Sequence, residues 1–140
     1  AIANALINPE IKSKLNDSDT LMIIMETASG KQCHINNSRS ATYGYDQRVE
    51  LFGSKGMVIS ENKKPHELKK YNSEHVDKSE PYLNFFIERY QEAYMNSISS
   101  FVESILEKKP VAVGFEDGRK ALLLAETAYK SIKSGRMEDI

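Results

Sequence analysis

The spacing of apolar residues changes part-way along this chain of 140 residues. Between residues 19 and 60 the apolar residues lie in short runs, and Val49 and Leu51 alternate with charged neighbours as in a strand with two different faces. Beyond residue 81 they recur at steps of three and four, the period of an amphipathic helix. Strands followed by helices, without strand-helix alternation, predict an α+β domain whose antiparallel sheet is covered on one face by two long C-terminal helices.

The strand part divides at its turn residues. The sequence Ser29-Gly30-Lys31 is typical of a tight turn joining two strands into a hairpin, and a second turn spans Gly53 to Gly56. We expect strands over residues 19–28, 32–38, 47–52 and 57–60, a short fifth strand near 67–71, and a loop over 72–80. Residues 1–18 have no long period and predict a short helical turn or an irregular lead-in.

Two helices are expected after the strands. The first begins beside Pro81, whose fixed φ suits a first turn, and Pro110 prevents it from continuing. The second runs from about Asp117 to Ser134, with Gly135 in the position where helices commonly stop.

One face of the sheet needs a partner other than the helices. The first strand carries Leu21 and Ile23 on one side and Met22 and Ile24 on the other, more apolar surface than a sheet with one solvated face requires. A second sheet or another subunit is expected to cover this other face, and of these we take the face to be an oligomer interface.

Composition excludes several classes of partner. The 19 basic and 20 acidic residues give a net charge of -1, which argues against nucleic acid. No apolar run reaches the roughly 20 residues of a membrane-spanning helix, so no membrane is expected. Cys33 is the single cysteine, which suits a reducing cytoplasm.

Metal, nucleophile and nucleotide motifs are missing from the sequence. The three histidines, His34, His66 and His75, do not have the i, i+4 spacing of a zinc site, and there is no GxSxG or GxGxxG motif. We therefore expect no catalytic, no cofactor-binding and no metal-binding residue in this chain.

The densest group of polar and aromatic residues spans 36–46, between two apolar strands. Its amides, phenols and guanidinium supply the donors and acceptors that replace water around the hydroxyls of a sugar or polyol. The alternative is an ordinary connection, in which Tyr43 packs, Tyr45 covers a core edge and Asp46 bonds the turn backbone.

Several linked motifs carry a resemblance to a known family. They are NNSRSATYGYDQRVELFGSKGM at residues 36–57, ENKKP at 61–65, FFIERYQEAY at 85–94, SFVESI at 100–105 and EDGRKALLLAETAYKSIKSG at 116–135. In order and spacing they resemble the C-terminal domain of the Gfo/Idh/MocA oxidoreductases, and most closely the inositol 2-dehydrogenases among them. The resemblance covers residues 19–136.

The resemblance implies specific roles. Tyr45, the second tyrosine of the YGYD motif, binds a substrate hydroxyl in such enzymes; Tyr43 is a neighbouring candidate for substrate binding, and Asp46 is structural. The family's sheet face pairs subunits into dimers or tetramers.

The resemblance also implies that the intact enzyme uses NAD to oxidise a polyol, myo-inositol to its 2-keto form. The Rossmann domain, the Glu-Lys-Pro lysine and the Asp-x-x-x-His pair of the family have no counterpart in these residues. We therefore expect residues 1–18 to be a lead-in and 19–140 the C-terminal substrate and oligomerisation domain of a larger enzyme, inactive alone and binding no cofactor itself. The choice of polyol, NAD against NADP and the oligomer number stay open. A stand-alone, non-catalytic oligomerisation module of the same fold is the alternative.

Overall fold

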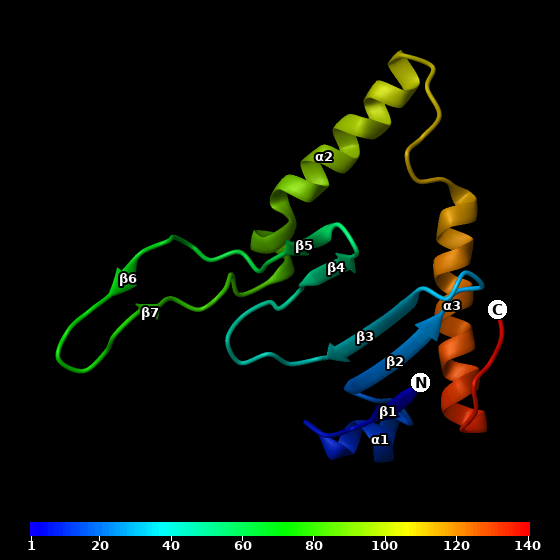
Figure 1. Cartoon of the computed structure of the whole chain (residues 1–140), viewed down its shortest axis with the longest axis horizontal. Helices are drawn as coiled ribbons and strands as arrows, with labels where there is room; N and C mark the ends of the chain where they lie inside the picture. The colour runs from blue at the N-terminus through cyan, green and yellow to red at the C-terminus, as the bar shows by residue number, and fades with distance from the viewer. The chain divides into compact units, whose positions relative to one another are not determined.

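A computed structural model describes residues 1–140 and confirms the α+β class. Strands β1 to β7 form three antiparallel sheets, and three helices accompany them (Figure 1). The chain divides into two compact units, residues 1–40 with 111–140 and residues 41–110. The sequence favoured one sheet, whereas the strands lie in three separate sheets.

The first unit contains a three-stranded sheet in the order β1-β2-β3. β1 (Ile2–Asn4) and β3 (Gln32–Ser38) flank β2 (Thr20–Glu26), and Ile23 lies opposite Ile35 in the β2-β3 register. The predicted hairpin is thus confirmed, and Gly30 takes a φ of 77° in its turn, as glycine does readily. Strand β1 lies within the expected lead-in and was not foreseen.

A short helix, α1 (Pro9–Leu15), follows β1. Asn8 caps it by accepting the backbone N–H of Glu10, and Pro9 stands at its first position, where no N–H is needed. The expected short helical turn is therefore present.

Helix α3 (Phe115–Ser134) packs against β1 in the same unit. It ends where the sequence predicts, because Gly135 adopts a left-handed φ of 67° and its N–H bonds back to Ser131. Thr127 and Ser131 are buried on this helix, and each donates its hydroxyl to a backbone carbonyl, so neither polar group is left unpaired.

The second unit holds two hairpins. One joins β4 (Val49–Gly53) to β5 (Gly56–Ser60), close to the predicted bounds. The other pairs β6 (Lys69–Lys70) with β7 (Lys78–Ser79). The prediction of a loop throughout 72–80 was wrong at its end, because residues 78–79 find a pairing partner in β6 that no local pattern reveals.

Helix α2 (Phe86–Leu106) begins later than predicted. The expected start beside Pro81 is wrong because the N–H groups of Tyr82 and Leu83 bond to Tyr43 and Lys63, which holds this segment extended. The helix starts once the chain leaves these contacts, and Glu88 of its first turn accepts the N–H of Asn84.

None of the three helices, α1, α2 and α3, is both long and apolar enough to cross a membrane.

Candidate functional site

The candidate site is built on the YGYD loop at residues 43–46 in the second unit. Tyr82 donates its backbone N–H to the carbonyl of Tyr43 at 3.0 Å, and Tyr45 donates its own to the carbonyl of Leu83 at 2.8 Å. Leu83 in turn donates to the carbonyl of Lys63 at 3.0 Å. Residues 82–83 therefore tie the YGYD loop to the segment after β5, and the tyrosines are held on a fixed backbone.

Gly44 permits this close approach. Its φ is 118°, and a Cβ at this position would lie 2.6 Å from the carbonyl oxygen of Tyr82. Any L-residue would both strain the backbone and push Tyr82 away. The glycine between the two tyrosines is thus required by the packing of the loop.

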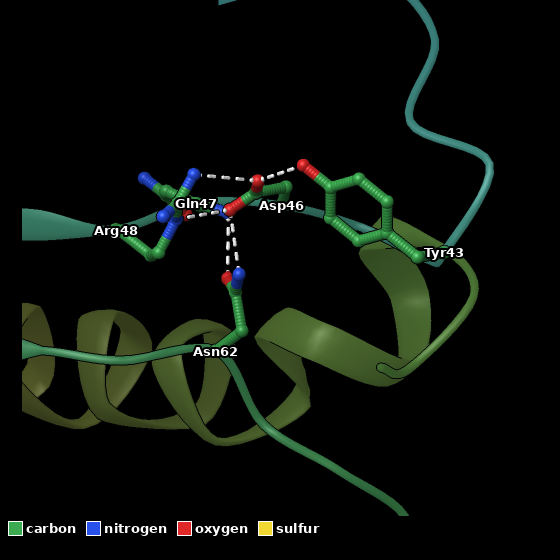
Figure 2. A network of polar contacts seen from close by, with 5 residues as sticks. All are labelled: Tyr43, Asp46, Gln47, Arg48 and Asn62. Atoms are coloured by element: carbon green, nitrogen blue, oxygen red, sulfur yellow. Dashed lines mark hydrogen bonds and ion pairs between the residues drawn. The ribbon is translucent and has the colours of Figure 1, made fainter. Parts of the chain in front are cut away.

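Asp46 is the centre of a polar network around the loop (Figure 2). Arg48 donates from Nε to Oδ1 at 2.8 Å and from Nη2 to Oδ2 at 3.0 Å, Asn62 donates to Oδ1 at 2.5 Å, and Tyr43 donates its phenol to Oδ2 at 2.5 Å. Asn62 also accepts the backbone N–H of Gln47 at 2.7 Å. Asp46 therefore bonds side chains and not the turn backbone, which was the expectation for an ordinary connection.

The network keeps Asp46 ionised. The hydrogen bonds from Arg48, then from Asn62 and Tyr43, lower the pKa of Asp46 to about 2. The bond to Asp46 raises the pKa of Tyr43, because the phenolate would face the carboxylate at close range. Near neutral pH this pair is therefore a carboxylate and a protonated phenol.

Tyr43 lines an open hollow of about 520 Å³ on the second unit. The residue is 49% exposed, and its ring packs edge-on against Tyr82, with ring centroids 5.9 Å apart. Lys64, which donates to Ser79 at 2.9 Å, lies on the same hollow. The hollow thus carries an aromatic wall and charged donors, the chemistry that suits hydroxyl-rich ligands.

Tyr45 has different surroundings. It is half-buried and meets Tyr90 of α2 edge-on, with ring centroids 5.5 Å apart. Tyr90 donates its hydroxyl to Oε1 of Gln47, and burial raises the pKa of Tyr90, which the neighbouring phenol of Tyr45 raises further. Tyr45 is not among the residues lining the hollow beside Tyr43.

The structure therefore places the two predicted site residues on one loop but in two surroundings. Their substrate-binding role stays a prediction. Sequence reasoning did not single out Asn62 or Tyr90, which join the site from the segment after β5 and from α2. The motifs ENKKP and FFIERYQEAY contain these two residues, and they are the only sequence signal that could have pointed to them.

The starts of α2 and α3 do not suit the phosphates of a nucleotide. The N-terminus of a helix binds a pyrophosphate when its N–H groups are free and no acid stands there. At α3 the carboxylate of Asp117 already accepts the N–H of Gly114 at 2.8 Å, and at α2 Glu88 takes the N–H of Asn84 at 3.1 Å. An acidic side chain therefore already occupies each of these helix starts, which disfavours a phosphate there. No group of three or more His, Cys, Asp or Glu side chains is placed to hold a metal ion.

Comparison with known proteins identifies the class. Residues 4–139 match the family model described as "Oxidoreductase family, C-terminal alpha/beta domain", the Gfo/Idh/MocA oxidoreductases. The chain belongs to this family, as the motifs of its YGYD loop and α2 indicate.

Several similar proteins are named as inositol dehydrogenases. An inositol 2-dehydrogenase of Rhizobium meliloti (strain 1021) is 42% identical over all 140 residues. The crystal structure of a myo-inositol dehydrogenase from Corynebacterium glutamicum superposes with a TM-score of 0.90 at 37% identity, over 96% of this chain and 40% of that one. A scyllo-inositol dehydrogenase from Lactobacillus casei, with bound NAD(H) and scyllo-inositol, gives 0.73 at 26% identity, over 84% of this chain and 34% of that one.

The match covers only part of each relative. The chain spans 42% of the length of the Rhizobium meliloti protein. The activity of a whole protein of this kind is therefore a separate question from the family of this domain.

Proposed function

We propose that the chain is the substrate and assembly domain of an NAD-dependent dehydrogenase that oxidises a secondary hydroxyl of a cyclic polyol, with myo-inositol as the first candidate. The observation that carries the proposal is the YGYD loop, which holds Tyr43 and Tyr45 on a backbone fixed by Tyr82 and Leu83. The names of the similar proteins support the choice of polyol.

In this proposal the residues of the chain position the substrate and do not carry out the chemistry. The nicotinamide, when bound, accepts the hydride, and we expect the nucleotide on the rest of the intact enzyme, since acidic side chains already occupy the starts of α2 and α3. Tyr45 supplies a phenol that hydrogen-bonds one ring hydroxyl. Its edge-on contact with Tyr90 limits rotation of the ring, so the bond costs little side-chain entropy when the substrate arrives.

The test uses the intact protein that contains this chain. Wild-type protein is assayed for reduction of NAD and of NADP with myo-inositol, scyllo-inositol and glucose. Tyr45→Phe removes one hydroxyl and is expected to lower kcat/KM for the preferred polyol about fivefold or more, the worth of one hydrogen bond. Tyr129→Phe on α3 is the matched control, because this tyrosine is exposed and outside the site. No oxidation of any polyol by the wild type, or unchanged kinetics in Tyr45→Phe, contradicts the proposal.

We also infer that the domain assembles into a homo-oligomer, a dimer or a tetramer. Leu51 and Val58 lie opposite each other on one face of the β4-β5 hairpin and are 67% and 69% exposed, and Phe52, which is 82% exposed, points to the other face. Both faces therefore offer apolar surface that a partner subunit would cover. Light scattering of the intact protein after size-exclusion chromatography measures the mass in solution. A monomer at micromolar concentration would remove this part of the proposal, and Phe52→Glu is expected to shift an oligomer toward smaller species. If the intact protein assembles but oxidises nothing, the alternative of a non-catalytic oligomerisation module is favoured.

A further inference from the structure

We propose that Asp46 is a positioning residue that sets the direction of hydrogen bonding at Tyr43, so that the phenol oxygen accepts from, and does not donate to, a ligand hydroxyl in the neighbouring hollow. This inference rests on the proposed function, and it adds to Tyr45 a second residue that selects the substrate.

The carboxylate of Asp46 has no remaining freedom to turn. Each of its two oxygens accepts two bonds, Oδ1 from Arg48 and Asn62 and Oδ2 from Arg48 and Tyr43, all between 2.5 and 3.0 Å. The two bonds from Arg48 form a planar fork, which fixes the plane of the carboxylate. Oδ2 is therefore held in one place, facing the phenol of Tyr43.

The direction of the bond follows from the chemistry of the pair. An ionised carboxylate only accepts hydrogen bonds, and a phenol has a single O–H to give. Because Arg48, Asn62 and Tyr43 hold the pKa of Asp46 at about 2, a protonated carboxyl that could donate to Tyr43 is absent at neutral pH. The O–H of Tyr43 is thus used internally, and only its lone pairs are available to a ligand.

The hollow beside Tyr43 also suits a ligand hydroxyl that donates to the phenol oxygen. Lys64 offers N–H donors to it, since an ammonium has three and one is used for Ser79. A ligand hydroxyl that donates to Tyr43 would have an adjacent hydroxyl free to accept from Lys64. A pair of neighbouring ring hydroxyls meets both requirements, whereas an ether or a keto oxygen next to Tyr43 meets an acceptor and is disfavoured.

A double-mutant cycle in the intact protein tests whether Asp46 acts through Tyr43. Asp46→Asn keeps the size of the side chain but replaces a carboxylate oxygen by an N–H₂ donor, which lets the phenol of Tyr43 reverse its bond. We expect KM for myo-inositol to rise about fivefold in Asp46→Asn and in Tyr43→Phe, with kcat changed less than about twofold. In the Tyr43→Phe background, Asp46→Asn is expected to have no further effect on KM. Equal effects of Asp46→Asn in both backgrounds, or no effect in either, would overturn the proposal.

A second measurement does not depend on activity. Tyrosine labelled with ¹³C at Cζ reports ionisation by NMR, and the resonance lost in Tyr43→Phe identifies Tyr43. Asp46, Arg48 and Tyr82 are the ionisable groups that influence this phenol, and Lys64 and Glu80 line the same hollow. Only Asp46 changes between the two proteins. Tyr43 is expected to ionise above the ordinary tyrosine value of roughly 10 in the wild type and at lower pH in Asp46→Asn.

The outcomes separate the two proposals. Ionisation of Tyr43 at the same pH in both proteins overturns the positioning role, and the wild-type titration alone shows whether the bond exists if Asp46→Asn does not fold. Failure of the wild-type protein to oxidise a polyol overturns the proposed function, while the titration still decides the bond between Asp46 and Tyr43.

Discussion

Gly44 and Tyr82 lie so close that a Cβ on Gly44 would meet the carbonyl oxygen of Tyr82 at 2.6 Å. The contact joins the loop between the two tyrosines to the segment that leads into α2. Because Tyr82 and Leu83 also bond Tyr43, Tyr45 and Lys63 through the backbone, the geometry of the candidate site depends on this one approach.

We therefore predict that Gly44→Ala lowers the free energy of unfolding by about 1–3 kcal/mol and weakens polyol binding, since the new methyl group strains a φ of 118° and displaces Tyr82. Urea unfolding measures the first effect. Gly118→Ala is the control, because a Cβ there meets nothing within 4 Å, and alanine within a helix is expected to stabilise by about 0.5–1 kcal/mol. Equal stability of Gly44→Ala and the wild type would rule out the close packing described.

Asp19 stabilises the fold of the first unit through its buried carboxylate. It is 3% exposed, and its carboxylate accepts the backbone N–H groups of Leu6, Ile7 and Asn8 at 2.7–3.0 Å. These bonds, with that from Asn8 the strongest, lower the pKa of Asp19 in the folded protein. The stabilisation is therefore complete above the unfolded-state pKa of roughly 4 and is lost as the pH falls through the lower folded value.

For Asp19→Asn we expect lower stability at pH 7 and a weaker loss of stability on acidification below about pH 4 than in the wild type. Hydrogen exchange should show faster exchange at Leu6, Ile7 and Asn8. Asp139→Asn, near the end of the chain, is a control that should leave these amides unchanged. Unaltered protection of the three amides in Asp19→Asn would show that the carboxylate does not hold this turn.

Arg48 is the largest contributor to the low pKa of Asp46. Arg48→Lys keeps the charge but loses the fork that contacts both carboxylate oxygens, so the pKa of Asp46 should rise from about 2 toward its ordinary range. A ¹³C NMR titration of the carboxyl carbon between pH 1.5 and 6 measures the change.

Arg39→Lys provides the comparison for this titration, because Arg39 contacts Asp17 at 3.5 Å in the first unit and has no bond to Asp46. It should leave the titration of Asp46 as in the wild type. If Arg48→Lys also leaves the titration of Asp46 unchanged, the bidentate contact contributes nothing to the ionisation of Asp46.

Asp117 caps α3 by accepting the N–H of Gly114 at 2.8 Å. Gly114 has no side chain with which to cap the helix itself. Asp117→Ala is expected to lower the free energy of unfolding by about 0.5–1 kcal/mol, because an N–H at the helix start loses its partner. Thermal unfolding followed by circular dichroism measures the effect. Glu126→Ala, an exposed position in the middle of the same helix, should change the stability far less.

Local sequence pattern determined the four main strands and most of α3. Alternation and turn residues are properties of neighbouring residues, so Gly30 and Gly135 mark a turn and a helix end whatever the rest of the chain does. The motif at residues 43–46 likewise indicated the family and drew attention to Tyr43 and Tyr45, because the order of residue types is visible without coordinates.

Tertiary structure alone decided what depends on partners far along the chain. Helical period extends back toward Pro81, yet α2 begins at Phe86 because the backbone of Tyr82 and Leu83 pairs with Tyr43, Tyr45 and Lys63. The bond that Asn62 makes to Asp46 belongs to the same group of contacts, since Asn62 reaches Asp46 from beyond the β4-β5 hairpin. Periodicity reports which face of an element is apolar, but a backbone or carboxylate hydrogen bond forms with whatever donor the fold brings near it.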